Sequence, residues 1–288
     1  MKSDSKKLDS AGALPADHDA TEAGPPGRSL LQRFRGPIGA TILLVVLVVT
    51  GEVLVDAGVL NEIIVPRPTD VAGAFGETIT DGFFYSHLWV TTFEVLVGFA
   101  VGTAIGFVLG AALGIFRFFR EIAYPYVIAF QGLPKVVLAP VFVTAFGFGT
   151  LSKIAMAVAI SFFPVLINTM AGLTSVEPDA VRLMRSLSAS RWHIFTKLAL
   201  PHSLPLVFAG IKTGLTLALV GAIVGEFVGA EEGLGYLLGV YSYQLQIPRV
   251  WAITLVLALL GVILFLAIEW VDRKLIFWRS EREMSATM

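Results

Sequence analysis

The sequence predicts an all-helical integral membrane protein with about six membrane-spanning helices, and three observations lead to this fold class. Of its 288 residues, 56% are hydrophobic and only 15% are charged, whereas soluble domains carry about 25% charged residues. About six mostly apolar stretches recur along the chain, and a helix needs about 20 such residues to cross the hydrocarbon layer. The 28 glycines are typical of membrane helices that pack closely.

The predicted spans can be placed in order along the chain. They cover approximately residues 37–55, 88–116, 122–146, 151–173, 204–225 and 250–270. The third span is interrupted by Lys135 and by three prolines, Pro125, Pro134 and Pro140. Because proline removes a backbone donor, we expect a kinked or broken helix there.

Both ends of the chain are expected to be cytoplasmic tails, residues 1–36 and 273–288. Residues 1–27 contain no aromatic side chain and cannot bury enough apolar surface to offset the entropy of ordering, so the N-terminal tail is expected to be disordered. With the N-terminus in the cytoplasm, most of the 21 Lys and Arg residues fall in cytoplasmic segments, as the positive-inside rule requires. The basic residues expected on the outer side are Arg67, Lys153 and Arg249.

A long cytoplasmic loop is expected between the fourth and fifth spans, at residues 174–203. Pro178 suits the first position of one short helix, and Ser190 could cap a second. Pro201 is expected to end this second helix before the fifth span begins. The second helix carries an apolar stripe of Trp192, Phe195, Leu198 and Ala199. Lipid does not require amphipathic helices in a loop, so we expect the loop to dock on a partner.

The same loop contains a spacing that characterises a known family. Arg182-Leu183-Met184 is followed four residues later by Ser188 and, ten residues further on, by a segment that ends in Leu200-Pro201. The permease subunits of binding-protein-dependent ABC importers have a cytoplasmic signature of Glu-Ala-Ala, Gly and Ile-x-Leu-Pro at this spacing. The sequence resembles that family, although only Leu200 and Pro201 match the signature outright.

The resemblance covers about residues 65–279 and extends to the nitrate, taurine and alkanesulfonate class of these permeases. The strings that carry it are Val65-Pro66-Arg67-Pro68-Thr69, Leu133-Pro134, Ala139-Pro140, Phe146-Gly147-Phe148-Gly149, Phe162-Phe163-Pro164, Leu187-Ser188-Ala189-Ser190-Arg191-Trp192, Glu226 and Gly233-Leu234-Gly235-Tyr236. The implied fold is the type I ABC importer permease bundle, over residues 37–272. The implied function is to form the path of a small solute across the cell membrane.

The resemblance also implies partners. An ATPase subunit on each half would bind ATP and Mg, so no cofactor is expected in this chain. The other expected partners are a substrate-binding protein outside, membrane lipid, and a second permease subunit, which forms a homodimer or a heterodimer with this chain. Nucleic acid is not expected. The cytoplasmic signature would lie in a cleft of the ATPase. The expected ATPase-coupling residues are Arg182, Leu183, Met184, Ser188, Trp192, Leu200 and Pro201.

An outer gate is implied by the resemblance at the loop from Glu226 to Tyr236. Gly233 and Gly235 lie in this loop and make it flexible. Glu226 ends the fifth predicted span, and a role in the gate or in docking is one interpretation of it. These four residues are therefore gate candidates.

Two further charged residues, Glu94 and Lys135, lie within predicted spans and are candidates for the solute path. An ionisable residue at mid-membrane costs about 2.5–3.5 kcal/mol, so it normally faces a partner or water. Glu94 could repel an anion, pair with Lys212 or Lys135, or lie at the interface. Lys135 could face the cavity or bond carbonyls freed by Pro134.

A series of five glycines in the second span has a spacing of four residues. These are Gly98, Gly102, Gly106, Gly110 and Gly114. The spacing places them on nearly one helical face, which favours close helix packing over a ligand path.

The sequence also argues against several function classes. It has no cysteine and no Gly-Lys dipeptide, so it lacks thiolate chemistry and a phosphate-binding loop, and with four histidines a metal site is not expected. The net charge of −1 gives no basic excess for nucleic acid. A secondary transporter that needs no ATP is the alternative, and a membrane-embedded enzyme is a third class. The implied substrates are nitrate, a sulfonate, another organic acid or a pyrimidine-type precursor, although acidic outer loops disfavour an anion.

Overall fold

The computed structural model describes residues 30–62 and 64–276, with side chains from Gly39 onward, and every regular element in these ranges is a helix. The predicted all-helical fold class is therefore confirmed. The elements are α1 (Leu30–Asp56), α2 (Pro68–Thr80), α3 (Gly82–Ile115), α4 (Arg117–Gln131), η1 (Lys135–Leu138), α5 (Ala139–Phe146), α6 (Thr150–Thr174), α7 (Pro178–Ser186), α8 (Arg191–Ile194), η2 (Phe195–Ala199), α9 (Leu200–Gly229), α10 (Leu234–Tyr243) and α11 (Ile247–Leu275). The chain divides at residue 50 into two units, and the description below concerns the second, residues 51–276.

α1 begins at Leu30, so residues 30–36, which the sequence assigned to the N-terminal tail, are helical. Residues 1–29 and 277–288, which hold most of both predicted tails, lie outside the described part of the chain. α11 runs to Leu275 and so includes the first residues of the predicted C-terminal tail.

Five helical segments in the described ranges are long and apolar enough to cross a membrane, and a sixth exists if one bent pair counts as a span. The bent pair joins α4 to η1 and α5, with an angle of 87°. The connection contains Gly132 and Pro134, and proline both restricts the preceding residue and lacks a donor. The predicted break in the third span is thus confirmed.

The fifth span starts earlier than predicted. A single helical rod runs over 39 residues from Arg191 to Gly229, through the π turn η2. In that turn the Leu200 N–H donates to the Phe195 carbonyl, five residues back. The prediction that Pro201 ends a helix is wrong, because the widened turn makes room for the proline ring at the start of α9.

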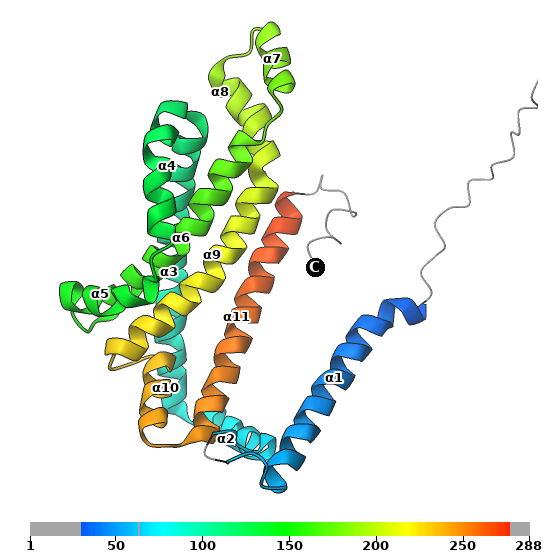
Figure 1. Cartoon of the computed structure of the whole chain (residues 1–288), viewed down its shortest axis with the longest axis vertical. Coiled ribbons are helices and arrows are strands. Elements are labelled where there is room, and N and C mark those ends of the chain that lie inside the picture. The colour runs from blue at the N-terminus through cyan, green and yellow to red at the C-terminus, as the bar shows by residue number, and fades with distance from the viewer. Residues whose placement is uncertain (1–29, 63, 277–288) are drawn as a thin grey trace, which may run out of the picture. The chain divides into compact units, whose positions relative to one another are not determined.

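The helices α3, α6 and α9 form the centre of the bundle (Figure 1). The glycine series of α3 packs against α6 at matching steps of four residues. The facing pairs are Gly98–Ala157, Gly102–Ser161, Gly106–Val165, Gly110–Thr169 and Gly114–Leu173. A Cβ atom at position 106 would lie 2.5 Å from the Phe162 carbonyl oxygen, so the backbones meet directly. The glycines are a packing face, as the spacing predicted.

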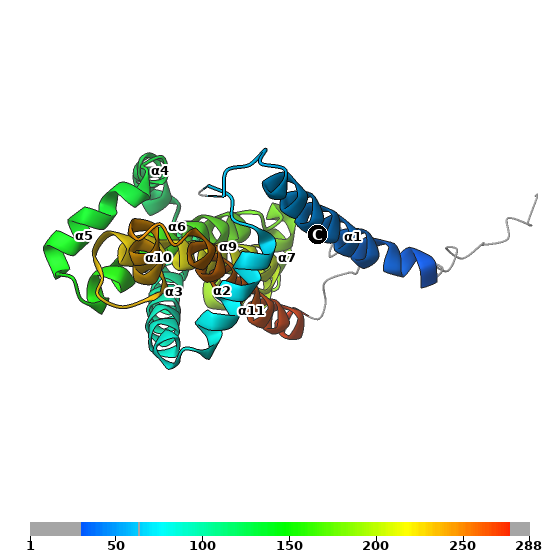
Figure 2. The ribbon, with the colours of Figure 1, turned by 90° about the horizontal axis from the view of Figure 1, so that it is seen from below.

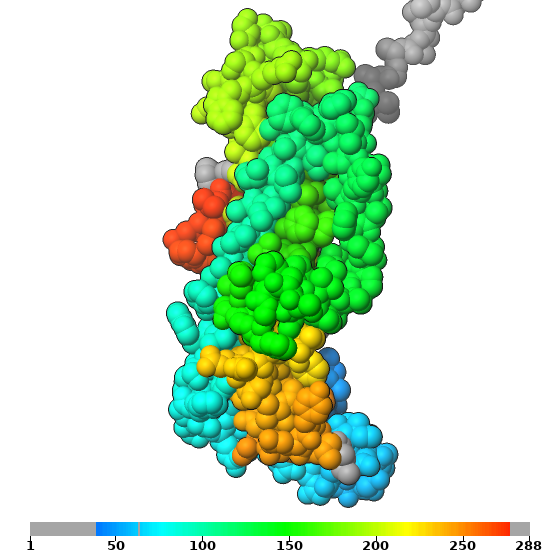
Figure 3. Space-filling view, turned by 90° about the vertical axis from the view of Figure 1, so that its left-hand side faces the viewer, coloured from blue at the N-terminus to red at the C-terminus, as the bar shows by residue number. Residues whose placement is uncertain are grey.

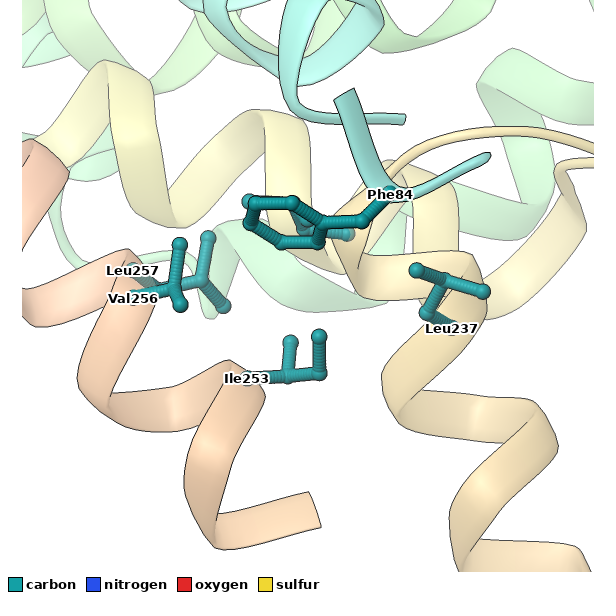
Figure 4. Packing of buried hydrophobic residues seen from close by; sticks show 6 residues of the cluster. Phe84, Leu237, Ile253, Val256 and Leu257 are labelled. Carbon is teal, nitrogen blue, oxygen red and sulfur yellow. The ribbon is translucent and has the colours of Figure 1, made fainter. Parts of the chain in front are cut away.

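The two ends of the bundle carry different short helices. α7 and α8 lie at one end, and α2 and α10 at the other (Figure 1). Seen from the α10 end, α4 and α5 lie at one edge, away from α11 (Figure 2). A hydrophobic cluster fixes α10 against the first turns of α3 and α11, with Phe84, Leu237 and Ile253 at its centre (Figure 4).

Candidate functional site

Five polar side chains are buried together where α3, α6, α9 and α10 meet. They are His87, Thr91 and Glu94 of α3, Lys153 of α6 and Glu226 of α9, and each is at most 2% exposed. We call them the buried polar cluster. Buried polar and charged groups are costly unless they are partnered, so their contacts define what this region does.

The first residues of α10 are held by the buried polar cluster. Glu226 accepts hydrogen bonds from the Gly235 N–H at 2.6 Å and from the Thr91 hydroxyl at 2.7 Å. The Leu234 N–H donates to Thr91 Oγ1 at 2.8 Å, and the Gly233 N–H donates to His87 Nδ1 at 2.9 Å. The Glu226 carboxylate thus lies on the N-terminus of α10, where negative charge is favourable.

Two glycines make this contact possible. Gly233 has φ of +112°, a conformation that side chains disfavour. At Gly235, an added Cβ atom would lie 2.7 Å from the Ile223 carbonyl oxygen and 2.9 Å from Glu226 Oε2. Residues 230–233, which we call the α9–α10 turn, are therefore held at their end, where the N–H groups of residues 233–235 bind buried side chains.

Glu94 and Lys153 complete the cluster. Glu94 is buried, and its Oε2 atom has no hydrogen-bond partner among the described residues. Lys153 donates to the carbonyls of Phe148 and Gly149. Glu94 pairs with neither Lys135 nor Lys212, because Gly98, one turn further along α3, packs on Ala157, which places Glu94 beside the start of α6.

The two lysines considered as partners of Glu94 lie elsewhere. Lys135 Nζ donates to the Gln131 carbonyl at 3.1 Å and lies 5.1 Å from the Phe163 ring centroid. Lys212 forms an ion pair with Asp272 at 2.7 Å. Lys135 is therefore the one gate or path candidate that the fold does not bring to the cluster.

The other gate candidates, Glu94, Glu226, Gly233, Gly235 and Tyr236, meet at the cluster, where the Tyr236 ring stacks on His87 with centroids 5.9 Å apart. Sequence reasoning missed His87, Thr91 and Lys153.

The sequence contains a pattern that could have identified two of the missed residues, His87 and Thr91. His87, Thr91 and Glu94 are spaced by four and three residues, which is a polar stripe on one face of an apolar helix. The charge count placed Lys153 outside the membrane, whereas burial in the first turn of α6 removes it from solvent.

The second candidate region is the loop between α6 and α9. α7 begins at Pro178, and the Ser190 hydroxyl accepts from the His193 N–H at 3.2 Å, so both predicted helix starts are confirmed. The large apolar side chains Leu183, Leu187 and Trp192 are 62%, 70% and 72% exposed. Such exposure on short, ordered helices is typical of a docking surface.

The remaining expected coupling residues have distinct surroundings. Arg182 is exposed and pairs with Asp179 at 3.0 Å. Met184, Leu200 and Pro201 are half-buried, and Ser188 is exposed in the turn between α7 and α8. Leu187 was not among the expected coupling residues, because the family signature does not include its position.

Ser188 adopts an unusual backbone conformation. Its φ is +58°, and α7 ends in a Schellman motif in which the Ala189 N–H donates to the Met184 carbonyl at 3.0 Å. Ser188→Gly is expected to stabilise the loop by roughly 0.5–1 kcal/mol, because glycine adopts this conformation without the steric cost. The rate of tryptic cleavage within residues 174–203 would measure this stabilisation, because a more stable loop is cleaved more slowly. Ser188→Val is expected to speed cleavage, and equal rates for both variants would contradict the assignment.

Comparison with known proteins gives a family match and several relatives. A family model described as the inner membrane component of binding-protein-dependent transport systems matches residues 102–277. The riboflavin transport system permease protein of Chloroflexus aurantiacus is 33% identical over 90% of this chain and 97% of its own length. The formylaminopyrimidine transport permease protein of Halalkalibacterium halodurans is 32% identical over 71% of this chain and 82% of its own.

A third relative and a solved structure extend the comparison. The putative aliphatic sulfonates transport permease protein of Bacillus subtilis is 28% identical over 96% of this chain and 99% of its own. A chain of the inward-facing MetNI methionine ABC transporter superposes with a TM-score of 0.56 at 20% identity, over 67% of this chain and 94% of that chain. This likeness establishes the fold.

Proposed function

Since the chain belongs to the family of inner membrane components of binding-protein-dependent transport systems, we propose that it forms the solute path of an importer driven by a separate ATPase. It is a multi-pass membrane permease and not itself a catalytic enzyme. The ATPase docks on the α7–α8 loop, and the α9–α10 turn is part of the outer gate. Both termini lie in the cytoplasm, and two permease copies pair in the membrane.

One observation carries the proposal. The rod from Arg191 to Gly229 begins at the exposed loop and ends at the α9–α10 turn. At 1.5 Å per residue it is about 58 Å long, which exceeds the roughly 40–45 Å of a whole bilayer. Because the rod is helical throughout, force applied at α8 moves Glu226, and Glu226 holds α10. Docking and gating are thus joined by one rigid element.

For the substrate class we favour a neutral nitrogen heterocycle of the pyrimidine type. Two relatives above 30% identity are named for riboflavin and formylaminopyrimidine transport. Acidic residues near the α2 and α10 end disfavour an anion; they are Glu62, Asp70, Glu77, Asp81, Glu231 and Glu232. Loops that repel anions are compatible with a neutral ring and unfavourable for a sulfonate.

Uptake into lipid vesicles tests the proposal. The permease is reconstituted with its ATPase and binding protein, and riboflavin, an aminopyrimidine and an alkanesulfonate are supplied as probes. We expect uptake of a heterocycle that requires both ATP and the binding protein, and no ATP turnover by the permease alone.

Two outcomes would overturn parts of this proposal. Accumulation by the permease alone under an ion gradient would make the chain a secondary transporter. ATP-dependent uptake of the sulfonate in preference to both heterocycles would retain the importer and reject the substrate class.

A further inference from the structure

Lys153 has no role in the function proposed above. It lies in the first turn of α6 and is 1% exposed, with its stem packed against α9, where an added Cβ atom at Gly225 would lie 3.3 Å from Lys153 Cγ. A buried ammonium at the N-terminus of a helix opposes the helix dipole. A residue kept there despite that cost needs compensation from specific partners.

The side chain of Lys153 lies between the α5–α6 turn and two buried carboxyl groups. Its ammonium donates to the carbonyls of Phe148 and Gly149, in the turn between α5 and α6. The carboxylates of Glu94 and Glu226 are buried beside it: Glu94 lies one turn before Gly98, whose partner Ala157 lies one turn after Lys153, and Glu226 follows Gly225, which contacts Lys153. Glu226 in turn binds the N-terminus of α10. Lys153 therefore stands between the α5–α6 turn and the α9–α10 turn.

The charge balance of the cluster depends on Lys153. Glu94 and Glu226 are both buried, and Lys153 is the cation buried with them in the same cluster. Two carboxyl groups in contact repel when both are ionised, and removing a buried counter-charge leaves that repulsion uncompensated. Without Lys153, Glu226 would be driven away from Glu94 and from the Gly235 N–H.

The end of α9 also touches α5 and the α5–α6 turn directly. An added Cβ atom at Gly229 would lie 3.1 Å from both Phe148 and Val143, so the end of α9 lies against α5 and its turn. The space-filling view shows α5 directly beside the end of α9 and above α10 (Figure 3). Apolar packing alone would allow α5 and the end of α9 to shift against each other. The hydrogen bonds of the buried polar cluster hold them in one position.

We propose that Lys153 is the positioning residue of the outer gate, which holds the Glu94–Glu226 pair in place and so makes α5 and α10 move together. The bent third span then opens and closes with the α9–α10 turn instead of independently. The proposal rests on the outer gate proposed above and adds Lys153 and α5 to it.

Distance measurements between α5 and α10 test the proposal. The native chain has no cysteine, so Val141→Cys in α5 and Tyr243→Cys in α10, which replace side chains 59% and 89% exposed, give one pair of spin labels per chain. The full chain is measured in lipid nanodiscs, without nucleotide, ATPase or binding protein. With the labelled chain diluted in an excess of unlabelled chain, so that pairs between two copies do not contribute, we expect a single narrow distance distribution in the otherwise native protein.

Three variants separate charge from packing. Lys153→Met keeps the side-chain length and removes the charge, and we expect it to add a second distance population. Adding Glu94→Gln removes one negative charge and is expected to restore the narrow distribution. Lys135→Met is the matched control, because Lys135 also donates to a backbone carbonyl but lies apart from the cluster; it should leave the distances unchanged.

Each outcome of the distance measurements either supports or overturns the proposed role of Lys153. An unchanged distribution in Lys153→Met, or a disturbed one that Glu94→Gln does not restore, would overturn the positioning role by charge. If Lys153→Met gives little folded protein, Lys153→Gln replaces it, since its amide still donates to a carbonyl, and the same rescue is required. Because no ATP is involved, a failure of the proposed ATP coupling would appear in the uptake experiment and not here.

Discussion

Replacing Gly106 with leucine is expected to prevent α3 and α6 from packing. An added Cβ atom at this position already lies 2.5 Å from the Phe162 carbonyl oxygen and 2.9 Å from Val165 Cβ. Backbone atoms cannot rotate away, so even Gly106→Ala is expected to cost about 1–3 kcal/mol. The measurement is the thermal unfolding midpoint, with the yield of monodisperse protein in detergent.

The control uses the same change where space is open. Nothing lies within 4 Å of a Cβ atom at Gly76 in α2, so Gly76→Leu should leave the midpoint close to that of the native chain. If Gly106→Leu and Gly76→Leu unfold at the same temperature, the glycine series is not the contact that joins α3 to α6.

Leu183→Asp in the α7–α8 loop is expected to abolish ATPase binding while the membrane helices still fold. Leu183 is exposed beside Arg182, so the change costs the bundle nothing and places a carboxylate in the proposed contact. Central interface residues contribute about 2 kcal/mol or more, which is about thirtyfold in affinity. Co-purification of the ATPase and ATP-dependent uptake in vesicles are the readouts.

Two further variants refine the test. Arg182→Glu breaks the pair with Asp179 and is expected to weaken binding less, because that pair is exposed. Ile79→Asp introduces a carboxylate at an exposed aliphatic position of α2, at the other end of the bundle, and should leave ATPase binding intact (Figure 1). Full binding by Leu183→Asp would remove the loop from the proposed docking site.

Much of the fold could be predicted from the sequence, for reasons particular to membranes. Apolar length determined where the spans lie, since lipid leaves no alternative to a helix with satisfied backbone groups. The regular spacing of Gly98 to Gly114 predicted a packing face, because a repeat of four residues stays on one side of a helix. The helix starts at Pro178 and Ser190 followed from local capping chemistry.

Other features depend on contacts that no local pattern encodes. The rod continues through Pro201 because a π turn precedes it, and nothing in residues 195–199 marks that turn. The charge count assigned Lys153 to the outer side but could not reveal that its side chain is buried. The surroundings of Glu94 depend on how α3 meets α6 and α9, which a single helix cannot reveal.

The glycine contact between α3 and α6 also restricts how this molecule can change shape. The two helices run in the same direction and interlock at five successive steps. A displacement by one turn, about 5.4 Å, toward the start of α6 would bring Gly98 opposite Lys153, whose side chain is far longer than that of Ala157. We therefore expect these two helices to move as one unit in any conformational change of the protein.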